Sequence, residues 1–220
     1  VSPRDSCVAA SHNRTCPLFC AEGCIIYAAI NKPGEHLKWL DLRSLCTSYL
    51  PLLGKNARLE AIYYFSALAT HRQTTDPTVI QRHERLLDCF RGCGIHVELG
   101  RFKAKPVSCP SCKTIWRRHE EKETDVAIAV RLLDLFYNDE CDTAVLMTGD
   151  TDIAPAIRTA RQRFPQKAIV CAFPFARKNK ELGALATRSF RISADSYVRH
   201  QLPNPFLHPD GRRIDRPATW

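Results

Sequence analysis

The chain has 220 residues, of which 45% are hydrophobic and 25% are charged, and its formal net charge is +9. This composition is ordinary for a soluble globular protein and allows one α/β domain with a small insertion. No apolar run reaches about 18 residues, so the sequence predicts no membrane span. The excess of Lys and Arg favours a polyanionic partner, although charge that serves only solubility would look the same.

The N-terminal residues 1–14 are predicted to form an extension ahead of the main domain. They lack the basic start and the long apolar stretch of a signal peptide, so we expect the cytoplasm as the location. A chain of this size does not need a disulfide framework, so most of the eleven cysteines are expected to be reduced, buried or incidental. Cys16, Cys20 and Cys24 recur every four residues, a spacing that does not match an iron–sulfur motif.

The main domain is predicted over residues 15–202, and its first half alternates strand-like and helix-like segments. The second helix in this half has a clear signature, with an acidic N-cap, Pro at the first helical position and glycines at its end. The elements expected are a strand at Cys16–Gly23, a helix at Leu37–Leu50, a strand at Arg58–Leu68, a helix at Asp76–Gly94 and a strand at Ile95–Phe102.

A small insertion is predicted at about residues 103–118, where prolines and a Cys109-Pro-Ser-Cys112 motif interrupt the alternation. The CxxC spacing supplies half of a zinc site, which would protrude from the domain. A redox dithiol is an alternative, although this CxxC does not open a helix after a strand, as that chemistry usually requires. Candidates for the remaining zinc ligands are His119, Cys89, Cys93 and His96.

The second half of the domain resumes the alternation. Strands alternating with helices of this length predict a parallel sheet covered by helices on both faces. The proline-spaced residues 203–220 are predicted to form a mobile C-terminal tail. The elements expected here are a helix at about Glu120–Tyr137, a strand at Thr143–Thr148, a helix at about Asp152–Arg163, a strand at Lys167–Phe175, and a short helix and strand at Lys180–Ala186 and Ser189–Ser193.

Acidic side chains follow two of the predicted strands. Glu22 ends the first strand, and Asp150 and Asp152 come directly after the Thr143–Thr148 strand. Ligands of open parallel sheets bind beyond the carboxyl ends of the strands. Asp125 is expected to join these acids because it heads the apolar stripe of the helix predicted from Glu120. The stripe consists of Glu121, Asp125, Ile128, Leu132 and Leu135.

Carboxylates brought together in this way repel one another unless a cation neutralises them. A hard divalent ion such as Mg²⁺ or Mn²⁺, held by Glu22, Asp125, Asp150 and Asp152, would do so. Each acid taken alone could instead cap a helix or complement its N-terminus. The convergence of three segments on one edge of the sheet favours the metal site.

Two motifs coincide with these acids, E-K-x-T-D at residues 121–125 and [ST]-G-D-[ST]-D at residues 148–152. Together with "HLKWLDLRSL", "GRFKAK", "CPSC" and "SFRIS…QLPNP", they make the chain resemble the NYN domain family, the LabA-like branch of the PIN-like nucleases. The resemblance runs from about Leu37 to Phe206. It implies a Rossmann-like, three-layer α/β/α PIN-like domain with a central parallel sheet, to which the CxxC-bearing insertion is added.

The resemblance also implies a metal-dependent ribonuclease that hydrolyses RNA phosphodiester bonds at Glu22, Asp125, Asp150 and Asp152. In such a site the metal polarises the phosphate and activates a water molecule. The family usually has Asp-Gly-x-Asn-Leu-Tyr after its first strand. This chain has Glu22 in place of the Asp and Ile25 in place of the Asn. A catalytically silent relative that binds only RNA or a partner protein is therefore the alternative.

Other residues are candidates for supporting roles. Lys122 is a candidate cation beside the scissile phosphate, with a surface ion pair as the alternative. Thr148 and Thr151 are candidate supporting hydroxyls, with strand-end and N-cap roles as alternatives. A homo-oligomer is left open. The candidates for RNA-backbone contacts, each of which could equally be a solvated charge, are Arg101, Lys103, Lys105, Arg117, Arg118, Arg177 and Lys178.

A phosphatase of the haloacid dehalogenase type would also carry a Gly-Asp…Asp segment late in the chain. Its chemistry needs an Asp nucleophile in a D-x-D-x-T segment after the first strand. No such segment lies near Glu22, so the sequence excludes this class.

Overall fold

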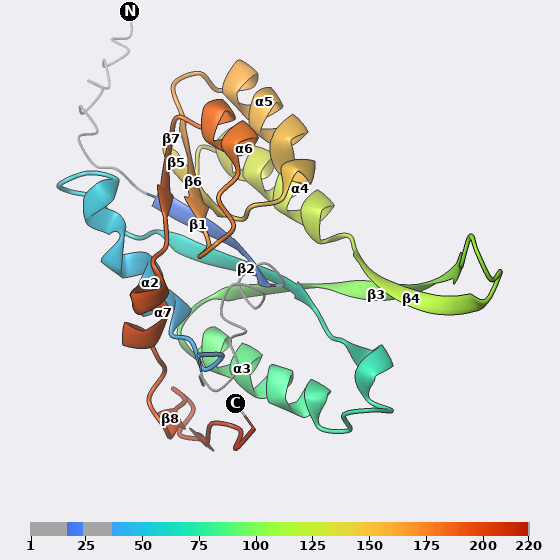
Figure 1. Ribbon diagram of the computed structural model, residues 1–220. Coiled ribbons are helices and arrows are strands. Elements are labelled where there is room, and N and C mark those ends of the chain that lie inside the picture. The colour runs from blue at the N-terminus through green and yellow to red at the C-terminus, as the bar shows by residue number, and fades with distance from the viewer. Residues whose placement is uncertain (1–16, 24–36, 220) are drawn as a thin grey trace, which may run out of the picture.

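The computed structural model describes residues 17–23 and 37–219 (Figure 1). Predictions that concern residues 1–14, Cys16, Cys24 and Ile25 lie outside the described residues. Among the helices of the described residues, none is long and apolar enough to cross a membrane.

Within these residues, a seven-stranded sheet has the order β4-β3-β2-β1-β5-β6-β7. From β1 the chain builds the sheet outward through β2 and β3, and then returns to add β5, β6 and β7 on the other side of β1. The order therefore reverses between β1 and β5, which is the kind of switch point where open parallel sheets bind ligands. The parallel strands are β1 (Pro17–Glu22), β2 (Ala61–Ala67), β3 (His96–Ser108), β5 (Thr143–Met147), β6 (Ala168–Phe173) and β7 (Arg188–Arg191), and β4 (Ile115–Lys122) runs antiparallel to β3.

Helices cover both faces of the sheet (Figure 1). One face carries α4 (Thr124–Tyr137), α5 (Ala154–Arg163) and α6 (Lys180–Leu185), and the other carries α2 (Leu42–Ser48), α3 (Val79–Gly92) and α7 (Ala194–Arg199). Successive strand residues point to opposite faces, so each central strand contributes to both hydrophobic clusters. The predicted three-layer α/β/α architecture is confirmed.

The helix predicted from Glu120 begins later, and that prediction is wrong at its N-terminal end. Glu120 and Glu121 belong to β4, and α4 starts at Thr124 after Glu123, whose φ is 80°. Glu121 is therefore not part of the helical stripe, whereas Ile128, Leu132 and Leu135 are buried on α4 as expected. The reason is local pairing, because β3 continues past Phe102 and holds these residues in an antiparallel ladder.

The CxxC insertion is the outer part of this β3–β4 hairpin, which extends well beyond the body of the domain (Figure 1). The CPSC motif forms its tip, where the backbone N–H of Cys109 donates to the carbonyl of Thr114 over 2.9 Å. The predicted protrusion is confirmed. It is an extension of the sheet ladder rather than a separate loop.

The C-terminal residues were predicted to form a mobile tail, and this is wrong for residues 203–219. Phe206 and Ile214 are buried in the hydrophobic cluster beneath α3. They come from β8 (Phe206–Leu207) and β9 (Arg213–Ile214), which pair antiparallel. The indole Nε1 of Trp39 also donates to the carbonyl of Pro203 over 3.1 Å. The two apolar anchors are too widely spaced to form a recognisable pattern in the sequence.

The remaining differences concern element ends and one short helix. The helix predicted at Leu37–Leu50 is shortened to α2, because the Asp41 side chain caps it by accepting from the backbone N–H of Ser44 over 2.8 Å. A 3₁₀ turn, η1 (Leu50–Leu52), follows it. Helix α7 was not predicted.

The partly buried imidazole of His83 on α3 makes stability depend on pH. Burial lowers the pKa of His83 from 6.5 to about 4, so the folded protein holds this side chain neutral. When folding lowers the pKa of a group, its contribution to stability is complete above the unfolded pKa. The contribution declines as the pH falls from the unfolded pKa to the folded pKa. We expect the melting temperature to fall more steeply between pH 6.5 and 4 in the parent than in His83→Gln. Thermal denaturation at a series of pH values tests this, and parallel curves would contradict it.

Candidate functional site

Three carboxylates from different elements converge at the carboxyl ends of β1 and β5. One oxygen of each of Glu22, Asp125 and Asp150 lies within 4.8 Å of the others. Among residues 17–23 and 37–219, this is the only group of three or more Cys, His, Asp or Glu side chains close enough to share a metal ion. The predicted approach of these three acids is confirmed.

The sheet register explains why Glu22 and Asp150 meet. Ala21 pairs with Met147, so the residues that follow them, Glu22 and Thr148, leave the two strands side by side. Asp150 comes two residues later, at the start of a 3₁₀ turn, η3 (Thr151–Ile153). The sequence predicted this meeting only in outline, because the register is a property of the folded sheet.

Thr148 connects two of the acids. Its Oγ1 donates a hydrogen bond to Oε2 of Glu22 and accepts one from the backbone N–H of Asp150 over 3.0 Å. Thr148 and Glu22 are both buried, with 2% and 3% of their surfaces exposed. One buried hydroxyl therefore fixes the Glu22 carboxylate relative to the backbone that carries Asp150.

Asp150 also caps the turn that follows it. Its Oδ1 accepts from the backbone N–H of Asp152 over 3.0 Å. The capping role considered as the alternative is therefore present, but it coexists with the cluster. A carboxylate has a second oxygen and further lone pairs with which to bind a cation.

Electrostatic repulsion is concentrated on Asp125. Burial raises the pKa of Asp125, and the neighbouring charges of Asp150, Asp152 and Glu121 raise the pKa further. Asp152 itself is exposed and lies outside the group of three, although it lines the same hollow as Asp125. The structure thus places Asp152 at the rim of the cluster.

A close backbone contact brings a basic loop next to the site. A Cβ atom on Gly149 would lie 2.5 Å from the carbonyl oxygen of Arg177, so only glycine fits at this position. The amide of Asn179 also donates to the carbonyl of Gly149 over 3.2 Å. The predicted basic residues Arg177 and Lys178 are therefore exposed in a loop beside Asp150.

The other predicted basic residues lie on the β3–β4 hairpin. Lys122 is on β4, where its Nζ donates to Oε2 of Glu120 over 2.9 Å. This is the surface ion pair that was considered as the alternative role for Lys122. Sequence reasoning did not single out Trp116, which is 48% exposed on β4. An aromatic residue directly before two arginines was the sequence signal that could have identified it. Also on the hairpin are Arg101, Lys103, Lys105, Arg117 and Arg118.

The CPSC motif gains no third ligand from the described residues. Hydrogen bonding with Thr114 and Cys109 lowers the pKa of Cys112 to about 7. The candidate ligands are engaged elsewhere or distant in the fold. They are His119, stacked on His71 with centroids 4.1 Å apart, His96, stacked on Tyr63 at 4.8 Å, and Cys89 and Cys93 at the end of α3. The zinc prediction is therefore unsupported by these residues.

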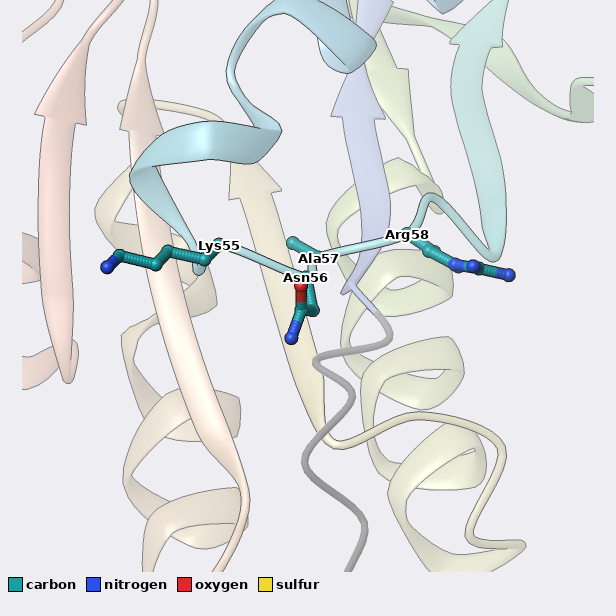
Figure 2. Close-up of a pocket in the computed structure, with 4 residues that line it drawn as sticks. All are labelled: Lys55, Asn56, Ala57 and Arg58. Carbon is teal, nitrogen blue, oxygen red and sulfur yellow. The ribbon is translucent and has the colours of Figure 1, made fainter.

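A separate hollow lies before β2 and is lined by Lys55, Asn56, Ala57 and Arg58 (Figure 2). The nearby Glu60 N–H donates to the carbonyl of Pro17, which places this region at the amino end of β1, away from Glu22. The side chains of Lys55 and Arg58 point away from each other in Figure 2. These four residues offer no acid or thiol, so the hollow has none of the chemistry of the acidic site.

Comparisons with known proteins agree with this architecture. The sequence model of the NYN domain matches residues 33–193. No curated protein matches the chain. The crystal structure of a protein of unknown function from Vibrio parahaemolyticus RIMD 2210633 is similar, with a TM-score of 0.52 and 15% sequence identity over 83% of this chain and 96% of that chain. At this identity the similarity shows the fold alone.

Removing one charge from the cluster should stabilise the protein when no metal is present. We expect Asp150→Asn to raise the melting temperature in buffer containing EDTA, because it relieves repulsion on Asp125. Asn also keeps the acceptor that caps η3. The parent should gain more from added Mn²⁺ than the variant.

The matched control is Asp195→Asn, which removes an exposed acid of α7 on the other face of the sheet. It should not raise the melting temperature in EDTA. A decrease for Asp150→Asn under the same conditions would show that repulsion does not limit the stability of the site.

Proposed function

Because the chain belongs to the NYN domain family, we propose that it is a metal-dependent endoribonuclease with its active site at Glu22, Asp125 and Asp150. Proteins of this family are generally nucleases that act on RNA. The observation that carries the proposal is the convergence of three carboxylates within 4.8 Å at the switch point of the sheet.

The donor set suits Mg²⁺ or Mn²⁺. All three side chains offer carboxylate oxygens, the hard ligands that these ions prefer, and neither sulfur nor imidazole belongs to the group. The same charges that raise the pKa of Asp125 would be neutralised by a divalent cation. A cation bound there would supply a Lewis acid that polarises the phosphodiester and lowers the pKa of a water molecule.

Other residues near the cluster would orient a ligand, transfer a proton and bind the RNA. Thr148 orients the Glu22 carboxylate through its hydroxyl. Asp152, exposed at the rim, would accept a proton from the attacking water. Arg177 and Lys178, in the loop that packs on Gly149, would contact RNA phosphates.

The catalytically silent relative remains the alternative, because Glu22 is longer than the Asp usual in the family. Two features favour a working site despite this difference. Glu22 reaches the other two acids, and Thr148 holds it in place. Ile25, the second departure, lies outside the described residues.

The proposal is tested by incubating labelled single-stranded RNA with the protein and Mn²⁺ or Mg²⁺, with EDTA as the control. Glu22→Gln and Asp150→Asn remove charge while keeping volume. Each should lower the cleavage rate by more than the ~10–100-fold that loss of an outer-shell partner costs. Glu22→Asp should retain activity or increase it.

Which variants lose cleavage distinguishes a working site at these acids from the alternatives. If Asp150→Asn is inactive and Glu22→Gln cleaves like the parent, Glu22 is not a ligand. If both variants cleave like the parent, the activity does not come from this site and the proposal fails. Salt-dependent RNA binding without any cleavage by the parent would favour the silent relative.

Thr148 provides a second prediction. Thr148→Val keeps the shape of the side chain but removes the hydroxyl that orients Glu22. We expect the Mn²⁺ concentration at half-maximal activity to rise about 10–100-fold. Thr148→Ser should restore it, whereas Thr151→Val, at an exposed position in η3, should leave it unchanged. Equal midpoints for Thr148→Val and the parent would contradict the positioning role.

A further inference from the structure

The β3–β4 hairpin has two chemically different faces over residues 101–122, which we call the arm. In the arm, Arg101 pairs with Lys122, Lys103 with Glu120, and Lys105 with Arg118. Alternate residues of a strand share a face with their cross-strand partners. One face, called the basic face, therefore carries five cations against one acid. Its members are Arg101, Lys103, Lys105, Val107, Trp116, Arg118, Glu120 and Lys122.

The opposite face is nearly neutral and partly anchored. Arg117 and Glu121 are its only Arg, Lys, Asp or Glu side chains within the arm's paired residues. Near the base of the arm, Phe102 and His119 pack on His71 of η2 (Thr70–Arg72), with ring centroids 4.7 and 4.1 Å from it. These contacts hold the opposite face to the body of the domain.

The charge of the basic face is only partly neutralised within the chain. Glu120 lies 2.9 Å from Nζ of Lys122 and 3.9 Å from Nζ of Lys105, and Arg101 pairs with Glu123 over 2.7 Å. Within the described residues, Lys103 and Arg118 form no ion pair. Protection of an edge strand against aggregation would explain charge along the arm. Such protection does not require that the cations lie on one face of the arm.

An aromatic side chain lies at the outer end of the basic face. Trp116 is 48% exposed on the basic face near the tip of the arm. A cationic groove or strand combined with an exposed aromatic ring is the composition that binds single-stranded nucleic acid, because charges contact the phosphates and unpaired bases stack on the ring. The bases of a duplex are already stacked, so a duplex offers this ring no comparable partner.

The base of the arm leads directly into α4, which carries Asp125 of the acidic cluster. Lys122 lies three residues before Asp125, and the backbone of Gly100 is so close to the carbonyl of Lys122 that a Cβ there would lie 2.6 Å from it. From Arg101 to Val107 the face runs outward for roughly 20 Å at the usual strand rise. A strand of RNA in the acidic site could therefore continue onto the arm.

We propose that the basic face of the arm is a binding site for single-stranded RNA that extends beyond the acidic cluster. Lys103, Lys105 and Arg118 contact phosphates, and Trp116 stacks on an unpaired base. The proposal rests on the proposed function for the identity of the polyanion as RNA. Binding to the arm itself requires no cleavage.

Binding is measured separately from cleavage by using Asp150→Asn in EDTA, with the anisotropy of a labelled single-stranded RNA as the readout. Two pairs of neighbours on β4 provide matched tests, since each pair has one residue on either face. Arg118→Ala should weaken binding and reduce the salt slope by about 0.7 for one lost phosphate contact. Arg117→Ala should do neither.

Trp116→Ala should weaken binding by roughly 5- to 150-fold, the range for loss of one stacked base, whereas Ile115→Ala on the opposite face should have little effect. Unchanged melting temperatures will show that these exposed substitutions leave the fold intact. Equal losses for the two arginine variants, or unchanged binding by Trp116→Ala, would overturn the proposal. Competition by an RNA duplex as strong as that by the single strand would overturn its single-strand assignment.

The two proposals fail in different ways. If the parent cleaves RNA with Mn²⁺ but Arg118→Ala and Trp116→Ala bind as the parent does, the arm proposal is wrong and the nuclease stands. If the parent never cleaves but these variants lose binding while Arg117→Ala and Ile115→Ala do not, the arm stands and the nuclease proposal is wrong.

Discussion

The parallel pairing of β1 with β5 is the constraint on which the site depends. Ala21 lies opposite Met147, so Glu22 and Thr148 emerge together at the point where the strand order reverses. A shift of one residue would move Glu22 to the other face of the sheet. The hydrogen bond from Thr148 to Glu22 then joins the two strand ends beyond the ladder.

The hydrophobic clusters on the two faces of the sheet stabilise the strands whose ends carry the acidic cluster. Every residue of β5 is buried, and neighbouring residues of β1 and β5 contribute alternately to the clusters beneath α3 and α4. These cores stabilise a sheet whose end carries mutually repelling acids, as the raised pKa of Asp125 indicates. This repulsion would be relieved by the divalent cation that the proposed function requires.

The arm shows how the same strand periodicity can separate two tasks. At its base, one face packs Phe102 and His119 on His71, which fixes the direction of the hairpin. The other face leaves Lys103 and Arg118 exposed. Successive side chains of a strand point to opposite faces. A residue that packs on the domain and an exposed cation can therefore be neighbours in the sequence without sharing a surface.

The sequence by itself determined the α/β class, the order of most elements and the acids at the strand ends, because these depend on local periodicity, capping and turn residues. Asp150 after an apolar strand and Asp125 ahead of an apolar helical stripe are examples of such local signals. Only the tertiary structure decided that Glu120 and Glu121 extend a hairpin instead of opening α4, and that Phe206 and Ile214 close the core under α3. The same holds for the contact of Thr148 with Glu22, 126 positions apart. In each case the outcome depends on pairing or burial between distant segments, which local sequence patterns do not encode.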